Sequence, residues 1–405
     1  MGPFARPYAM DRQSRGSPAE VFAAFLRLGL TSFGGPIAHI GYFRRELVER
    51  RGWVSQAQFA QLLGLCQFLP GPASSQLGFA LGLLRAGWGG ALAAFLAFTL
   101  PSALLLFAFA ELLPGAPAAA AAVLVHGLKL VAVAVVAFGL VGMARELCPD
   151  APRAGIAAAS AFAALAFPHA ATQLAVVVLG ALAGLLAGRA VAPARADAPS
   201  LPYGRGLGIA LLCAYAALLV ALPLAGAALG SRVAVAAAFY RAGALVFGGG
   251  HVVLPLLQQM VVEPGWLSRD EFLAGYGAAQ AVPGPMFTLA SYLGTRLGGG
   301  LGGAMGAASA VLAIFLPGLL LVAGTLPLWR AVVAHPSAAR ALSGTNAAVV
   351  GLLAAAFYDP VWKSAVHAPL DIVIAAVGFA ILAAWRASAL WVVAWCVAAA
   401  ALAGA

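Results

Sequence analysis

Charge is scarce in this sequence, and acidic residues and lysine are the scarcest. Charged residues make up 9% of the 405 positions, against roughly 25% in an ordinary soluble domain. Only 13 Asp and Glu stand against 23 Lys and Arg, and only 2 of the basic residues are Lys. Hydrophobic residues reach 63% and the mean hydropathy is +0.96. These values exclude a soluble enzyme and predict an integral membrane protein.

Patterns for metal, cofactor or nucleotide chemistry are also missing. The 4 Cys lie singly, without CxxC or Cys/His spacing, and the 6 His form no HExxH pair. No GxxxxGK[ST] motif is present, so ATP is not expected to supply energy within this chain. The net charge of +10 comes from Arg in short groups between apolar stretches, which is typical of membrane orientation rather than nucleic-acid binding. We therefore expect no metal, no cofactor, no nucleic acid and no catalytic residues.

Long apolar stretches are what the sequence does contain. Residues 88–113, 116–144 and 207–229 each exceed the roughly 20 residues that cross a bilayer as a helix. Such stretches fill nearly the whole chain and leave no room for a separate soluble domain. The exceptions are a polar start at 1–18 and a Pro-containing stretch at 191–205.

One passage is written twice. Phe25, Arg27, Gly29, Phe33, Gly34 and Gly35 recur in order and spacing as Phe239, Arg241, Gly243, Phe247, Gly248 and Gly249. Gln67 with Pro70-Gly71-Pro72 likewise recurs as Gln280 with Pro283-Gly284-Pro285. The repeat predicts five regions, namely a disordered cytoplasmic tail (1–18), a first transporter repeat (19–190), a linker (191–205), a connecting transmembrane helix (206–229) and a second repeat (231–405).

We predict an all-α polytopic membrane protein with about 13 transmembrane or re-entrant helices, some broken by Gly and Pro, in two inverted repeats. Matching loops differ in charge: residues 44–51 hold four Arg, whereas residues 263–271 hold three acids and one Arg. Cytoplasmic loops are enriched in Lys and Arg, so the two loops are expected on opposite sides. The N-terminus and the 44–51 loop are then cytoplasmic.

The breaks are the candidate substrate site. Gly costs about 1 kcal/mol and Pro about 3 kcal/mol in a helix, and broken backbone at membrane depth is tolerated only inside protein or beside a watery cavity. Freed helix N-termini are anion sites. The candidate substrate-binding residues are Arg27, Arg241, Lys129, Ser32, Gly34, Gly35, Gln67, Gly71, Ser74, Ser75, Gly248, Gly249, Gln280, Gly284 and Thr288.

Plainer interpretations stand beside these. The glycines can serve helix packing, Arg27 can extend to the cytoplasmic interface, and Lys129 can have a structural partner. His39 and His251 are more often structural histidines than proton carriers.

Residues 25–43 (FLRLGLTSFGGPIAHIGYF) and 66–78 (CQFLPGPASSQLG) resemble the signatures of the chromate ion transporters, and 247–255 and 283–294 fit the diverged second copy. The resemblance covers nearly the whole chain and implies a secondary carrier of the bacterial inner membrane that exports chromate, a tetrahedral dianion. Import or exchange of sulfate or another oxyanion is the main alternative. A channel and a membrane enzyme acting on phospholipid head groups remain further alternatives. The expected partners are the oxyanion, the lipid bilayer and, as a candidate assembly, a second copy in a homodimer.

Overall fold

The computed structural model describes residues 16–32, 35–115, 117–167, 170–187, 201–246, 253–328, 336–385 and 389–403. Every regular element in these ranges is helical, so the all-α class is confirmed. Most of the predicted tail and most of the predicted linker lie outside the described residues.

The first half comprises α1 (Pro18–Thr31), α2 (Gly35–Phe43), η1 (Arg44–Arg50), α3 (Gln56–Phe68), α4 (Ala73–Leu112), η2 (Leu113–Gly115), α5 (Ala118–Leu147), α6 (Ala151–Ala166) and α7 (Ala170–Ala187). Between the halves runs α8 (Arg205–Leu229). The second half comprises α9 (Ser231–Leu245), α10 (Val253–Leu257), η4 (Gln258–Val262), α11 (Arg269–Ala281), η5 (Met286–Thr288), α12 (Leu289–Arg296), α13 (Gly303–Thr325), η6 (Leu326–Leu328), α15 (Pro336–Ala356), η7 (Phe357–Trp362), α16 (Lys363–Ala365), α17 (Pro369–Ala383) and α18 (Ala389–Ala403).

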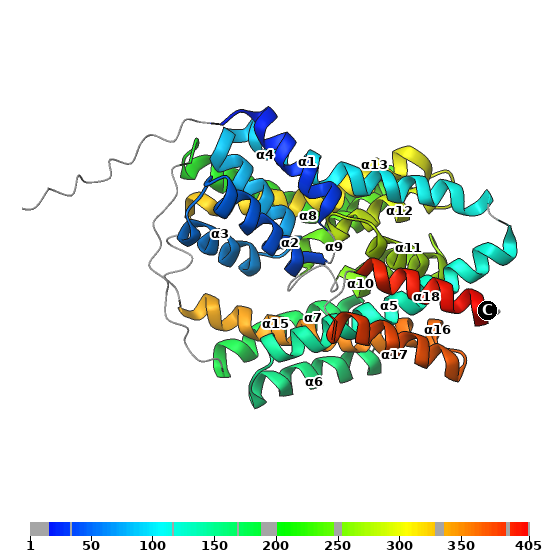
Figure 1. The fold of residues 1–405 in the computed structure, drawn as a ribbon. Coiled ribbons are helices and arrows are strands. Elements are labelled where there is room, and N and C mark those ends of the chain that lie inside the picture. Colours follow the sequence, from blue (N-terminus) through cyan, green and yellow to red (C-terminus); the bar gives the residue numbers. More distant parts are fainter. Residues whose placement is uncertain are drawn as a thin grey trace, which may run out of the picture.

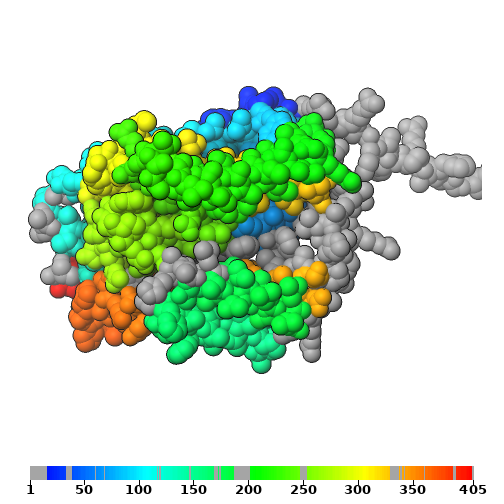
Figure 2. Space-filling model, turned by 180° about the vertical axis from the view of Figure 1, so that it is seen from behind, coloured from blue at the N-terminus to red at the C-terminus, as the bar shows by residue number. Residues whose placement is uncertain are grey.

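Four segments of the described chain are long and apolar enough to cross a membrane: Ala73–Gly115, Ala120–Arg145, Arg205–Leu229 and Gly303–Leu328. Five shorter apolar helices accompany them, and the count of about thirteen is not confirmed. Almost none of the α8 span is buried, and Figure 2 shows this helix lying across the outer surface. An apolar helix that the protein leaves uncovered is suited to contact lipid.

In the first half, the chain folds into two helical hairpins, one formed by α1 with α2 and η1 and the other by α3 with the start of α4. Each hairpin ends beside Glu20, near the start of α1. The chain returns from α1 and α2 so that Trp53 Nε1 donates to Glu20 Oε1 at 3.1 Å. Helix α3 then leads to the Pro70–Pro72 break, and the first arm of α4 comes back until Arg85 Nη2 reaches Glu20 at 3.1 Å. Non-helical backbone at Ala86 and Gly87 bends α4 there, before its long apolar arm begins.

In the second half, α11 and α12 form a hairpin on either side of the Pro283–Pro285 break. Arg296 Nη2 donates to Glu271 Oε1 at 2.7 Å and closes the α11–α12 hairpin. Along α12, Ser291 donates to Ala103 O at 2.7 Å and Tyr292 stacks on Phe109 at 5.7 Å between ring centroids. Helix α12 therefore runs from the Pro283–Pro285 break toward Leu112, the C-terminal end of α4.

The long helices α4 and α13 are antiparallel. Tyr203 lies beside Trp88, near the start of the long arm of α4, and its hydroxyl donates to Ala323 O near the end of α13 at 2.6 Å. The hairpins of the two halves thus open toward opposite ends of the bundle.

The remaining long helices, α5 and α15, each pack against helices of the other half. Helix α5 packs against α17 and α18 of the second half, whereas α15 packs against α6 and α7 of the first. Figure 1 shows α6, α7, α15 and α17 gathered on one side of the molecule and α1, α4, α8, α12 and α13 on the other. Gly344 on α15 lies directly against Gly180 and Gly184 on α7, with no room for a side chain between them. Because each half encloses a long helix of the other, the halves form one body.

Candidate functional site

The Gly-rich breaks and the Pro-Gly-Pro turns of the two halves are joined to each other by two matching backbone hydrogen bonds. The Gly71 N–H donates to Val246 O at 2.7 Å, and the Gly284 N–H donates to Ser32 O at 2.9 Å. Gly71 and Gly284 are equivalent in the sequence repeat. Ser32 and Val246 are also equivalent, since each directly precedes a Phe-Gly-Gly. Each Pro-Gly-Pro turn is therefore tied to the Gly-rich break of the other half.

Both central glycines have backbone that other residues rarely adopt. Their φ angles are +123° at Gly71 and +105° at Gly284. A Cβ on Gly71 would lie 2.9 Å from Gln76 Nε2 and 3.1 Å from Gly318 Cα. A Cβ on Gly284 would lie 2.8 Å from Ser102 Oγ. Glycine is therefore required twice over at each position, for its φ and for the close approach of a neighbouring helix.

Around these breaks, four buried side-chain oxygens have no hydrogen-bond partner among the described residues. They are Ser32 Oγ, Ser75 Oγ, Gln76 Oε1 and Thr99 Oγ1. Their residues are at most 3% exposed. An unsatisfied buried polar atom costs about 1–3 kcal/mol, so such a group in a native protein calls for a ligand or water. Ser32 and Ser75 were predicted site residues, whereas Thr99 carries no motif and was missed.

His39 lies in the same region and contacts Ser32, before the Gly-rich break, and Ser74, after the Pro-Gly-Pro turn. Its Nδ1 lies 3.3 Å from Ser74 Oγ and its Nε2 lies 3.2 Å from Ser32 O, with all three residues buried. The predicted site residue Ser74 thus has a protein partner. Ser32 O receives the Gly284 N–H as well, so His39 supports the carbonyl through which the two halves are joined.

The amide Nε2 of Gln76 ties the first Pro-Gly-Pro turn to α13. It donates to Pro70 O at 2.9 Å and to Gly318 O at 3.2 Å. Helix α4 begins at Ala73 with no side-chain cap. The uncapped N–H groups of the first turn, at Ser74 and Ser75 among others, are donors of the kind that bind anions at helix N-termini.

Other predicted residues are placed less centrally. Gln280 is buried, with its amide nitrogen 3.9 Å from Met286 Sδ, and Thr288 donates to Pro285 O at 2.6 Å. Gln67 is exposed on α3. Gly35 is the first residue of α2, whereas Gly34, Gly248 and Gly249 lie outside the described residues.

The two matched arginines have different surroundings. Arg241 is half-buried on α9. Arg27 is exposed and lines a pocket of about 250 Å³ together with Leu28, Thr31, Tyr42, Arg45, Glu46 and Arg50. No carboxylate in the described ranges pairs with Arg27 or Arg241.

Lys129 has a partner that the sequence could not reveal. Its Nζ lies 2.5 Å from Asp270 Oδ1, at the start of α11, and the two side chains are 9% and 65% exposed. The pair joins α5 to the hairpin that leads to the second Pro-Gly-Pro turn. A structural partner therefore exists for this lysine, as the plainer interpretation required.

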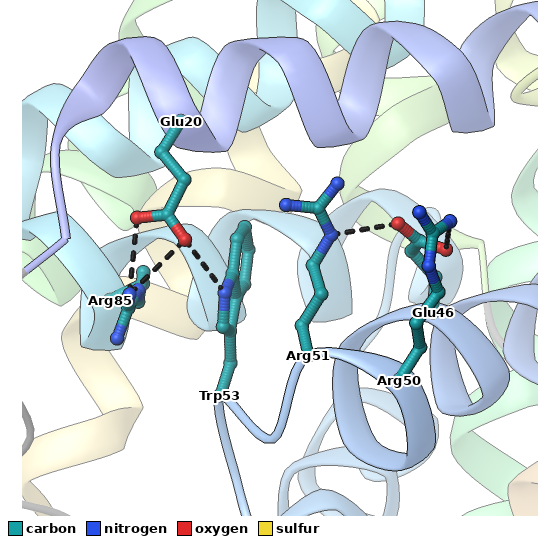
Figure 3. A network of polar contacts seen from close by, with 6 residues as sticks. All are labelled: Glu20, Glu46, Arg50, Arg51, Trp53 and Arg85. Carbon is teal, nitrogen blue, oxygen red and sulfur yellow. Dashed lines mark hydrogen bonds and ion pairs between the residues drawn. The ribbon is translucent and has the colours of Figure 1, made fainter.

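A charged network closes the first hairpins at their outer ends (Figure 3). Glu20 accepts from Arg85 and Trp53, and the Trp53 ring lies between the guanidinium groups of Arg85 and Arg51, at 5.5 and 5.6 Å. Glu46 accepts from Arg51 at 2.7 Å and from Arg50 at 2.9 Å. Burial opposes ionisation of Glu46, but hydrogen bonds and charge from these arginines outweigh it and hold its pKa below the usual value.

Comparison with known proteins gives one consistent family. The sequence model of the family described as "Chromate transporter" matches residues 19–185 and 233–405. The "Chromate transport protein" of Pseudomonas aeruginosa is 31% identical over 91% of this chain and 87% of its own length. The "Probable chromate transport protein" of Synechococcus elongatus is 30% identical over 82% of this chain and 81% of its own. No solved structure matches. The chain belongs to the chromate transporter family.

Proposed function

We propose that this protein is a secondary active transporter that exports chromate across the bacterial inner membrane. The observation that carries the proposal is the crossed pair of hydrogen bonds, Gly71 to Val246 and Gly284 to Ser32, next to buried hydroxyls that have no partner within the described part of the chain. Paired breaks in corresponding positions of two halves are where transporters bind their substrates. The relatives named for chromate transport make this oxyanion the first candidate.

In the proposed site, the first turn of α4 supplies backbone donors and the hydroxyls of Ser32, Ser75 and Thr99 supply side-chain donors. The N–H groups of Gly71 and Gly284 are already engaged, so these glycines join the halves and serve as hinges rather than as direct ligands. Arg27 and Arg241 balance the charge of the dianion, one from each half. Lys129 contributes through its pair with Asp270, which fixes the hairpin of α11.

We further propose that the two halves are inverted repeats, with the N-terminus and the Arg-rich 44–51 loop in the cytoplasm. The opposed hairpins support this arrangement, and the Arg content of the two matching loops supports its orientation. Alternating access then consists of opening one set of hairpins while the other stays closed. The proton gradient or the membrane potential supplies the energy.

Uptake of radiolabelled chromate into everted membrane vesicles tests the proposal. The double variant Arg27→Gln/Arg241→Gln should lose transport while still inserting into the membrane, because a dianion would enter a site without compensating charge. Arg232→Gln removes an exposed charge at the start of α9 and should keep transport. Full transport in the double variant would refute the role of these arginines. Inhibition by sulfate stronger than self-competition by chromate would favour a sulfate carrier.

A further inference from the structure

The pocket beside Arg27 is built by the two arms of the first hairpin. Arg27, Leu28 and Thr31 come from α1, Tyr42 comes from α2, and Arg45, Glu46 and Arg50 come from η1. Thr31 directly precedes Ser32, whose carbonyl joins the two halves. The pocket therefore lies next to the central break. Its volume of about 250 Å³ is below the roughly 300 Å³ at which drug-sized ligand sites begin, so it suits a small ion with some of its water.

The charges in this pocket do not cancel. Arg27 and Arg45 have no carboxylate partner in the described part of the chain, and the carboxylate of Glu46 is shared between Arg50 and Arg51. The pocket is lined by the guanidinium groups of Arg27, Arg45 and Arg50 and by one carboxylate, so two positive charges are left over. The charge of Arg51, which pairs with Glu46 but does not line the pocket, adds to this excess. Because neutralising this excess takes two negative charges, the pocket complements a doubly charged anion better than a neutral solute.

Membrane orientation alone does not account for this arrangement. Arg44, next to Arg45 on η1, serves orientation equally well, yet its Nε pairs with Glu49 at 3.1 Å and the residue is not part of the pocket. The second half has no equivalent, because Gln258 and Gln259 stand in η4 where Arg44 and Arg45 stand in η1. The excess charge is therefore found at one mouth of the protein and not at the matching position of the other.

We propose that this pocket is a docking site for a tetrahedral dianion at the mouth of the first hairpin, next to the central breaks, and that Arg27 serves both the docked dianion and the dianion at the centre. This inference rests on the proposed function: the pocket binds the oxyanion from the cytoplasm before the ion reaches Ser32. A mouth lined by charge of one sign concentrates ions of the opposite sign and raises their rate of association. Arg45 is the residue particular to this step, because it lines the pocket and forms no ion pair with a carboxylate of the described residues.

The test compares Arg45→Gln with Arg44→Gln, two exposed neighbours on η1 whose variants lose the same charge. Chromate uptake is measured in everted vesicles over a range of concentrations at low and at high ionic strength. Arg45→Gln should raise the half-saturating concentration about fivefold at low ionic strength, with an unchanged maximum rate and a smaller difference at high salt. Arg44→Gln should follow the wild type, and Arg45→Lys should restore most of the affinity.

Equal shifts in the two glutamine variants would overturn the docking site, because general surface charge would then explain both. A fall in maximum rate without a change in half-saturation would also overturn it. Equilibrium binding of radiolabelled chromate to the purified protein separates the two proposals. If wild-type vesicles fail to accumulate chromate but the protein binds it and Arg45→Gln weakens that binding, the export proposal falls and the docking site stands. If the wild-type protein does not bind chromate, the docking site falls.

Discussion

Replacing Gly71 or Gly284 with Ala should separate the structural requirement at the crossed breaks from ordinary glycine effects. Each glycine combines a positive φ, a close neighbour and a backbone hydrogen bond to the other half. A non-glycine residue in such backbone costs about 1–3 kcal/mol, and loss of the hydrogen bond adds roughly 1 kcal/mol. We therefore expect each variant to lose about 2–4 kcal/mol of folding free energy, a large part of the 5–15 kcal/mol typical of native proteins.

The steric term has the same form at the two positions, with one side-chain atom and one backbone atom close to the added Cβ. At Gly71 a Cβ would press on Gln76 Nε2 and on Gly318 Cα, a backbone atom that cannot rotate away. At Gly284 it would meet Ser102 Oγ at 2.8 Å and Phe98 O at 3.2 Å. Both replacements push α4 or α13 outward, and we expect chromate transport to be lost in both.

Two controls isolate the cause. Gly52 also has a positive φ, of +61°, but no atom lies within 4 Å of its Cβ position, so Gly52→Ala should lose only the backbone term and keep transport. Gly64 lies in α3 with open space around it, and Gly64→Ala should leave the protein as stable or up to about 1 kcal/mol more stable. Stability is measured by denaturant unfolding in detergent and transport in everted vesicles. If Gly71→Ala behaves like Gly52→Ala in both assays, the crossed breaks are not what holds the site together.

Three further outcomes follow from individual contacts. Ser75→Ala removes a buried hydroxyl that no described residue bonds, so unfolding measurements should show unchanged or higher stability while chromate affinity falls; unchanged affinity would remove Ser75 from the site. A double-mutant cycle of Lys129→Met and Asp270→Asn should give a coupling of roughly 1 kcal/mol or less in unfolding experiments, because Asp270 is 65% exposed; a coupling of several kcal/mol would contradict this. Because the folded protein lowers the pKa of Glu46, the carboxylate stabilises the fold above its unfolded pKa of about 4.5, and this contribution is lost as pH falls through the folded pKa. The free energy of unfolding should therefore fall less steeply with acid in Glu46→Gln than in the wild type. Identical pH dependence in the two proteins would contradict the assignment.

The sequence was most informative where the two halves share a motif. Helix-breaking residues in matched positions predicted a substrate site at the breaks. The structure brings Gly71 and Gly284 against the break of the other half, and their part in substrate binding stays a prediction. Which break joins which could not be predicted, because a repeated motif is equally compatible with pairing within one half and pairing across halves. The hydrogen bonds to Val246 and Ser32 decide in favour of pairing across halves.

Side-chain partners were predicted least well, for a physical reason. Lys129 and Asp270 are 141 positions apart, and a salt bridge of that separation leaves no local pattern in one sequence. Gln67 carries the repeated motif, yet it lies on the exposed face of α3, because motif membership does not fix which face of a helix a residue occupies. Arg45 was interpreted only as an orientation signal, since the pocket that gives it a second role exists only when α1 and η1 fold together.

The backbone hydrogen bonds at the centre are matched between the halves, whereas the charges at the two mouths are not, and these two properties suit different parts of a transport cycle. In the proposed site the hydroxyls of Ser32, Ser75 and Thr99 all belong to the first half, so one set of side-chain donors serves the substrate from either side and equilibrium binding there favours neither direction. The mouths differ, with Arg45 at one and Gln259 at the equivalent position of the other. Equilibrium affinity at the centre cannot bias the direction of flux, but a charged mouth raises the rate of capture from one side. On the proposed orientation that side is the cytoplasm, so the asymmetry speeds loading for export while the energy source determines the net direction.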